Sequence, residues 1–162
     1  MSSKAQGPRI TYREAVERLV SDINRIEEYI RSLQQNANIV LAELEELRIA
    51  REALEQLKQY KGEEALLALD RRGHVMARGI ITGKDKVVAS IGGDFLMELP
   101  IDEAIKIVTA KEGDLRNTLN AINQEISSAY ALYEKLRATL SRLIEEAEKR
   151  AAEQRREQPG SG

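Results

Sequence analysis

The sequence contains two long segments in which apolar residues recur at alternating gaps of three and four positions. Each series runs through about five heptads, which is typical of a coiled coil and exceeds the ~10–14-residue helix of an ordinary globular core. We therefore predict two long helices that fold back on each other as an antiparallel coiled-coil hairpin. The apolar positions are Val16, Leu19, Ile23, Ile26, Ile30, Leu33, Ala37, Val40, Leu44 and Leu47, then Leu115, Leu119, Ile122, Ile126, Ala129, Tyr133, Leu136, Leu140, Leu143 and Ala147.

The ends of both helices carry recognisable signals. Thr11, followed three residues later by Glu14, predicts a capping box at the start of the first helix. Asp102 is the expected N-cap of the second helix. The predicted organisation is a tail over residues 1–10, helices over 11–61 and 101–157, and a second tail over 158–162.

The heptad pattern is less regular close to the segment that joins the helices. After Leu47 the pattern meets Arg51, and continuing it through Ala50 and Leu54 implies a three-residue stammer. In the second helix, Lys111-Glu112-Gly113 precedes the regular series. We expect the coiled coil to separate in this region.

Two antiparallel registers fit the heptads. One places Ala37 opposite Ala129, which leaves a void. The other places Ala37 opposite Ile122 and Ala129 opposite Ile30, which combines small with large side chains and fills space better. We favour the second register.

The apolar period changes to two within residues 62–100, which predicts a small β insert in a mainly α protein. Gly73, Gly83, Gly92 and Gly93 separate the apolar runs and suit tight turns. We expect two hairpins, the first strand with the second and the third with the fourth. The strands are Ala65–Leu69, His74–Ile81, Asp85–Ile91 and Asp94–Leu99.

The predicted strands present apolar residues on one face. Four short strands without a covering helix cannot bury such a face alone. We therefore interpret the insert as an oligomerisation module that closes its open sheet edges by pairing between subunits, as in an intersubunit β-barrel. The residues of this face are Val75, Ala77, Ile81, Val87, Ala89, Ile91, Phe95, Met97 and Leu99.

Composition excludes several classes of protein. The chain has no Cys, so it forms neither a disulfide framework nor a thiolate metal site, and a reducing cytoplasm is the expected location. A net charge of −2 gives no general attraction to nucleic acid or to an anionic membrane. No apolar run approaches the ~18–20 residues of a membrane span, and no secretory signal is expected.

A specific resemblance adds to this interpretation. The run V-V-x-S-I-G-G-D-F-L-M-E (Val87 to Glu98), followed by I-D-E-A-I (Ile101 to Ile105) at the start of a heptad helix, resembles the alpha class of archaeal prefoldin subunits. The specific part extends from about Leu66 to Ala104, and two hairpins rather than one favour the alpha class. The first turn, Asp70 to His74, is more charged than is usual in the family.

The resemblance implies an assembly and an activity. Two alpha subunits with four beta-class subunits form a double β-barrel from which six coiled coils extend. The family binds unfolded proteins at the coiled-coil tips, without nucleotide or another cofactor, and passes them to a group II chaperonin. The implied partners are therefore beta-class subunits, unfolded clients and the chaperonin.

The residues themselves predict a compatible mechanism. Apolar side chains cluster near the free helix ends, and Val20 and Ile144 lie beside the heptad positions, so they should remain partly exposed. Such a surface suits transient capture of unfolded chains. The alternative is that most of these residues are simply the last layers of the coiled coil. The candidate binding residues are Ile10, Tyr12, Val16, Leu19, Val20, Leu140, Leu143 and Ile144.

No catalytic or metal site is predicted, and we expect no enzyme activity. His74 has no acid–base partner in the sequence pattern, and Gly83-Lys84-Asp85 lacks the spacing of a phosphate loop. Basic residues near the end of the chain are interleaved with glutamates, which indicates a solvated face rather than a nucleic-acid site. The basic residues are Lys149, Arg150, Arg155 and Arg156, and the glutamates are Glu148, Glu153 and Glu157.

Two other functions fit the same fold. One is a structural subunit that self-assembles through its β insert into a filament. The other is a coiled-coil tether for a particular folded partner.

Overall fold

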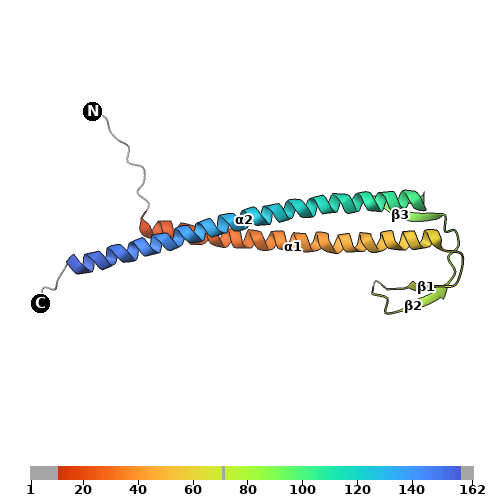
Figure 1. Cartoon of the computed structure of the whole chain (residues 1–162), viewed down its shortest axis with the longest axis horizontal. Helices are drawn as coiled ribbons and strands as arrows, with labels where there is room; N and C mark the ends of the chain where they lie inside the picture. Colours follow the sequence, from red (N-terminus) through yellow and green to blue (C-terminus); the bar gives the residue numbers. More distant parts are fainter. Residues whose placement is uncertain (1–10, 71, 158–162) are drawn as a thin grey trace, which may run out of the picture. The chain divides into compact units, whose positions relative to one another are not determined.

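The computed structural model describes residues 11–70 and 72–157. It is mainly helical with two small antiparallel hairpins, which confirms the predicted fold class (Figure 1). The chain divides into a terminal unit, residues 1–37 with 121–162, and a central unit, residues 38–120. The elements are α1 (Tyr12–Gln59), β1 (Ala65–Ala68), β2 (Met76–Gly79), β3 (Lys86–Gly92), β4 (Phe95–Pro100) and α2 (Ile101–Glu157).

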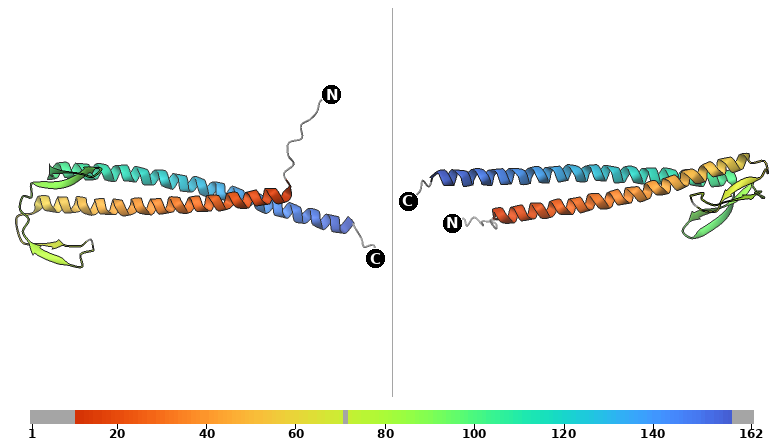
Figure 2. Two further views of the ribbon diagram at one scale, coloured as in Figure 1. Left: turned by 180° about the vertical axis from the view of Figure 1, so that it is seen from behind. Right: turned by 90° about the horizontal axis from the view of Figure 1, so that it is seen from below.

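Within each unit, the α1 and α2 segments lie side by side and run in opposite directions (Figure 2). Every predicted heptad residue is buried or half-buried, so the heptad assignment is confirmed. The apolar residues with the least exposure are Ile30, Leu33, Ala37 and Ala129 in the terminal unit and Ile101 and Ala104 in the central unit.

The position of Ile30 favours the register that combines small with large side chains. Ile30 shares a cavity with Tyr130 and Tyr133, which places it at the level of this part of α2. Ile30 and Ala129 are only 5% and 6% exposed. This level agrees with the second register, in which Ala129 lies opposite Ile30.

The capping box at the start of α1 is present. The Thr11 backbone N–H donates to Glu14 Oε2 at 2.8 Å, and the Glu14 N–H donates to Thr11 Oγ1 at 3.3 Å. The hydrogen bond from the Thr11 backbone holds the pKa of Glu14 below its ordinary value. Two of the N–H groups at the helix start are thus satisfied locally.

The predicted N-cap of α2 is wrong. The helix begins at Ile101, directly after β4, so Asp102 lies within the first turn. The Ile101 N–H donates to the carbonyl of Asp85 at 3.3 Å, and Asp102 forms an ion pair with Lys58 at 2.5 Å. A backbone acceptor in the connection before β3 therefore takes the place of the expected side-chain cap.

The predicted stammer is also wrong. Arg51 is half-buried and Ala50 exposed, so the heptad continues through the arginine. Glu112, only 5% exposed, occupies a heptad position of α2, and its carboxylate lies 3.0 Å from Arg51 Nε. Each helix thus has a charged residue at a heptad position, and the two residues form one ion pair. Glu55 also pairs with Arg51, and Arg116 also pairs with Glu112.

The two hairpins pair as predicted. Strand β1 pairs with β2, and β3 pairs with β4, with a bulge between Ser90 and Gly92. The β3–β4 loop is Gly93-Asp94, and Gly93 has φ of 56°. A glycine with positive φ at the first loop position suits a type II′ turn, whose twist matches the flanking strands.

The Arg51–Glu112 pair gives a stability prediction. Glu112→Leu should lower the Tm, because it removes the principal carboxylate that faces the half-buried Arg51. The double variant Arg51→Leu/Glu112→Leu should be more stable than either single variant, since apolar side chains then complete the heptads. Circular dichroism during heating measures both effects.

Arg48→Leu provides the matched control. Arg48 is paired with Glu45 and Glu52 on the exposed side of α1, so its loss should change Tm little. An equal Tm for Glu112→Leu and Arg48→Leu would contradict a special role for the buried pair.

Candidate functional site

The terminal unit carries an exposed apolar surface at the start of α1 and near the end of α2. Tyr12, Val20 and Ile144 are 47%, 41% and 41% exposed, as expected for Val20 and Ile144 beside the heptad. Ile10 lies outside the described residues. The half-buried members are Val16, Leu19, Leu140 and Leu143, and we call all seven described residues the terminal surface.

An open groove continues this surface along α2. Its floor is formed by small or apolar side chains, and its rim carries Glu146 and Arg150. Tyr12, the first residue of α1, lines the groove together with α2 residues as far as Gln154. An apolar floor with a rim of both charge signs accepts many different side chains.

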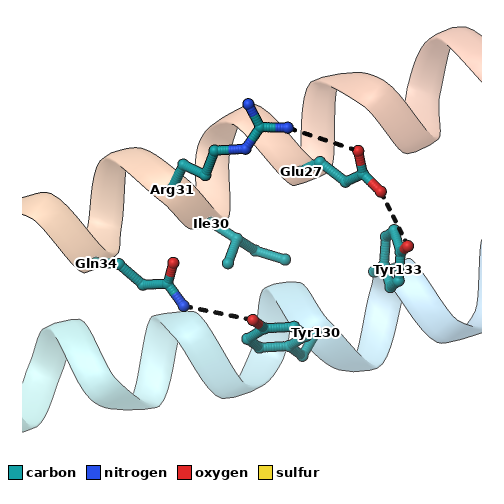
Figure 3. A pocket seen from close by; sticks show the side chains of 6 residues that line it. All are labelled: Glu27, Ile30, Arg31, Gln34, Tyr130 and Tyr133. Atoms are coloured by element: carbon teal, nitrogen blue, oxygen red, sulfur yellow. Dashed lines mark hydrogen bonds and ion pairs between the residues drawn. The ribbon is translucent and has the colours of Figure 1, made fainter.

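Tyrosines line a second cavity of the terminal unit (Figure 3). The Tyr133 hydroxyl donates to Glu27 at 2.9 Å, and Gln34 Nε2 donates to the Tyr130 hydroxyl at 3.4 Å. The bond to the Glu27 carboxylate raises the pKa of Tyr133. The sequence alone does not indicate this cavity, because Tyr130 lies outside the heptad series and only the pairing of helices brings it to Gln34.

The face of the β3–β4 hairpin assigned to oligomerisation is partly covered by helices of the same chain. Val87 and Ala89 are half-buried and share a cavity with apolar residues of α1 and α2. The expectation that no helix covers the strands is therefore wrong for this hairpin. Val88 and Leu96 are 66% and 72% exposed and offer an outer apolar surface instead.

Other predicted residues of this face are more open. Ile91, Phe95 and Met97 are 41%, 74% and 46% exposed. The pairs Val87–Leu99 and Ala89–Met97 confirm that these four residues share one face of the β3–β4 hairpin. Exposure thus rises along this face toward the hairpin loop.

The β1–β2 hairpin has exposed apolar residues on both faces. Val75, a predicted oligomerisation residue, is 57% exposed, whereas Ala77 and Ile81 are half-buried. A two-stranded hairpin of this kind is marginally stable alone. The exposed residues on or beside these strands also include Leu66, Leu69, Met76 and Ile80.

Tyr60 holds together the two connections of the β1–β2 hairpin. Its hydroxyl donates to the carbonyl of Glu63 before β1 and accepts the N–H of Ile81 after β2, the latter at 3.1 Å. Lys84 Nζ donates to the Tyr60 carbonyl at 2.7 Å. The hairpin is therefore anchored at its base and presents its apolar strands beyond it.

Asp70 organises the charged turn of this hairpin. Its carboxylate accepts the N–H of Val75 at 2.9 Å and that of Arg72 at 3.1 Å, and lies 2.8 Å from His74 Nδ1. The bond from Val75, followed by that from His74, lowers the pKa of Asp70 below its ordinary value. His74 thus has a structural partner in the turn.

The described part of the chain shows no other candidate chemistry. Within residues 11–70 and 72–157, no group of three His, Cys, Asp or Glu side chains could hold a metal ion. None of the helices in these ranges combines the length and apolarity of a membrane span.

These features define a class: two-helix coiled-coil proteins whose helices are separated in sequence by β-hairpins. The sequence signature described as "Prefoldin subunit" matches residues 12–146. The chain therefore belongs to the prefoldin family of chaperone subunits.

Several relatives are named Prefoldin subunit alpha, which agrees with the resemblance to the alpha class. One from Saccharolobus islandicus is 28% identical over 133 residues, 82% of this chain and 89% of the relative. One from Saccharolobus solfataricus is 27% identical over 136 residues, which are 83% of this chain and 91% of the relative. One from Hyperthermus butylicus is 25% identical over 159 residues, which are 98% of this chain and 100% of the relative.

The fold also resembles a solved structure. The match is to a cryo-EM structure of filamentous PFD from Methanocaldococcus jannaschii, with a TM-score of 0.61 and 24% identity. It covers 73% of this chain and 97% of the other. The likeness supports the fold of paired helices and hairpins.

The lowered pKa of Asp70 predicts an acid transition. A carboxylate with a depressed pKa stabilises its turn above the ordinary value of 3.8, and this stabilisation is lost as pH falls through the lower folded value. Hydrogen exchange at the Val75 amide, followed by NMR, should therefore lose protection in acid below pH 3.8. In Asp70→Asn this acid transition should be absent; its persistence would contradict the role of the carboxylate.

Proposed function

We propose that this chain is the alpha subunit of an ATP-independent cytoplasmic chaperone of two alpha and four beta-class subunits. It captures unfolded proteins on the terminal surface and passes them to a group II chaperonin. The subunits assemble through the β-hairpins. The stoichiometry and the chaperonin step rest on membership of the family.

The observation that carries the capture mechanism is the exposure of Tyr12, Val20 and Ile144 on one end of the paired helices. These apolar side chains lie on an open surface that can take up segments of varied sequence. A phosphate loop is not needed for such capture. Lys84, in the Gly-Lys-Asp run before β3, donates instead to the carbonyl of Tyr60.

Assembly through the hairpins is supported by their exposed apolar area. Leu66, Val88 and Leu96 are 65%, 66% and 72% exposed in the isolated chain. The hairpins also form two separate two-stranded sheets, so each has free edges. Pairing with strands of other subunits would satisfy the backbone groups and bury the apolar side chains.

Client capture predicts a separable defect. Val20→Ser/Ile144→Ser should weaken protection of a denatured test protein, because it removes apolar capture area worth at most about 1.5–3 kcal/mol per side chain. Deleting residues 1–20 and 141–162 should abolish it while the oligomer persists, since coiled-coil stability is spread over many layers. Aggregation is followed by light scattering with the assembled complex.

The matched control is Ile49→Ser/Leu132→Ser, which removes slightly more exposed apolar side chains elsewhere on α1 and α2. It should protect the test protein like the unmodified chain. Full protection by the truncated complex would move the client site away from the terminal surface. No protection of the test protein by the unmodified complex would favour a coiled-coil tether for a particular folded partner over a chaperone subunit.

Assembly predicts a second defect. Leu96→Glu should lower the oligomer mass without loss of helix. Leu96 is exposed in the single chain, so the substitution should leave the fold intact. In an interface between subunits, however, the new carboxylate would be buried and unpaired, which is costly. Ile39→Glu, at a 65% exposed position of α1, should leave the oligomer unchanged. Light scattering gives the mass and circular dichroism the helix content; equal masses for both variants would oppose assembly through this hairpin.

A filament subunit is the second candidate, favoured by the likeness to a protein that was solved as a filamentous assembly. Mixing the purified chain with a beta-class partner distinguishes the two candidates. A chaperone subunit should give a complex of limited mass that contains both chains. A filament subunit should give large homopolymers that ignore the partner.

A further inference from the structure

The central unit contains an apolar cavity between β3 and both helices. Its volume is about 340 Å³. Leu54 and Leu57 of α1, Ile107 of α2 and Val87 of β3 contribute side chains to its wall. We call this space the β3 cavity.

Alanines create and open this cavity. Ala50 and Ala53 on α1 are exposed, so the cavity is accessible between their short side chains, and Ala104 on α2 is buried in its wall. The charged group nearby is Lys111, whose Nζ already donates to the Ser90 carbonyl at 2.7 Å. An apolar side chain is therefore the occupant that the lining suits.

The same hairpin carries a side chain of the required kind. Phe95 is the only phenylalanine of the chain and is 74% exposed, more than any other large apolar residue described. It alternates with Met97 and Leu99, so it lies on the hairpin face that also carries Val87 and Ala89. Phe95 thus extends the cavity-lining face beyond the part that the helices cover.

Phe95 does not reach the cavity of its own chain. Its backbone pairs with Gly92 directly before the tight Gly93-Asp94 loop, which holds it at the end of the hairpin. Filling the cavity with this ring from within the chain would require breaking that pair. A neighbouring chain has no such restriction.

We propose that Phe95 of a second copy of this chain docks in the β3 cavity. This inference rests on the proposed assembly through the hairpins and names one contact of that assembly. Ring and cavity share one hairpin face, so two copies related by a two-fold axis can each donate a ring and accept one. The contact would bury the most exposed aromatic side chain and fill the β3 cavity at the same time.

Cysteine cross-linking tests this contact directly, because the chain has no native cysteine. One copy carries Asp94→Cys, which leaves Phe95 in place, and a second, size-tagged copy carries Ala53→Cys at the cavity mouth. After mixing, reassembly with beta-class subunits and mild oxidation, we expect a covalent heterodimer on a denaturing gel. Disulfide formation requires close approach of the two Cα atoms.

The matched control replaces Ala53→Cys by Ala110→Cys. Ala110 is also an exposed alanine of the central unit, but it does not line the cavity. We expect at least a tenfold lower yield of heterodimer. Equal yields, or no cross-link in a complex of normal mass by light scattering, would overturn the proposed contact and leave the proposed chaperone function intact.

A cavity-filling variant keeps the inference testable if the cysteine variants assemble poorly. Ala53→Phe should occupy the cavity from within the chain and reduce assembly, while Ala110→Phe should not. Circular dichroism confirms that both remain helical. Normal assembly of Ala53→Phe would overturn docking, and weakened assembly without the Asp94–Ala53 cross-link would exclude a second copy as the occupant.

Discussion

The heptad contact between α1 and α2 is the constraint on which the remaining structure depends. Two paired helices provide a single line of core side chains, and no large side chain of the described residues is fully buried. Stability is therefore spread in small amounts over many layers. The helix ends can expose Val20 and Ile144 without loss of the fold, and the short strands need packing partners to bury the apolar residues that their own helices leave uncovered.

The buried ion pair adds specificity to this repetitive contact. A heptad pattern alone tolerates displacement by one repeat, because each layer resembles the next. A one-heptad displacement in one direction would bring Glu112 to the level of Leu44 and leave the carboxylate without a cation, whereas a displacement in the other direction would bring it to the level of Lys58. The cost of a buried unpaired charge thus disfavours the displacement toward Leu44, even though an apolar pair at the same positions could be more stable.

Much of the fold could be predicted from the sequence because the responsible signals are local. Heptad spacing identified the core residues, Thr11 and Glu14 identified the cap, and glycines identified the hairpins. The Arg51–Glu112 pair could not be identified in this way, since each charge alone looks like an interruption. Alternation likewise placed Val87 and Ala89 on one face, but it carries no information about which face meets the helices.

The three helix alanines around the β3 cavity connect fold and assembly. Leu or Ile at positions 50, 53 or 104 could fill the space from within the chain, and each missing contact lowers the stability of the isolated subunit. An open apolar cavity is consistent with a stable complex if another chain supplies those contacts. The same reasoning applies to Phe95, whose exposure carries a solvation cost until a partner covers it. The isolated chain is thus incomplete in its packing at the hairpins, and the proposed assembly would complete it.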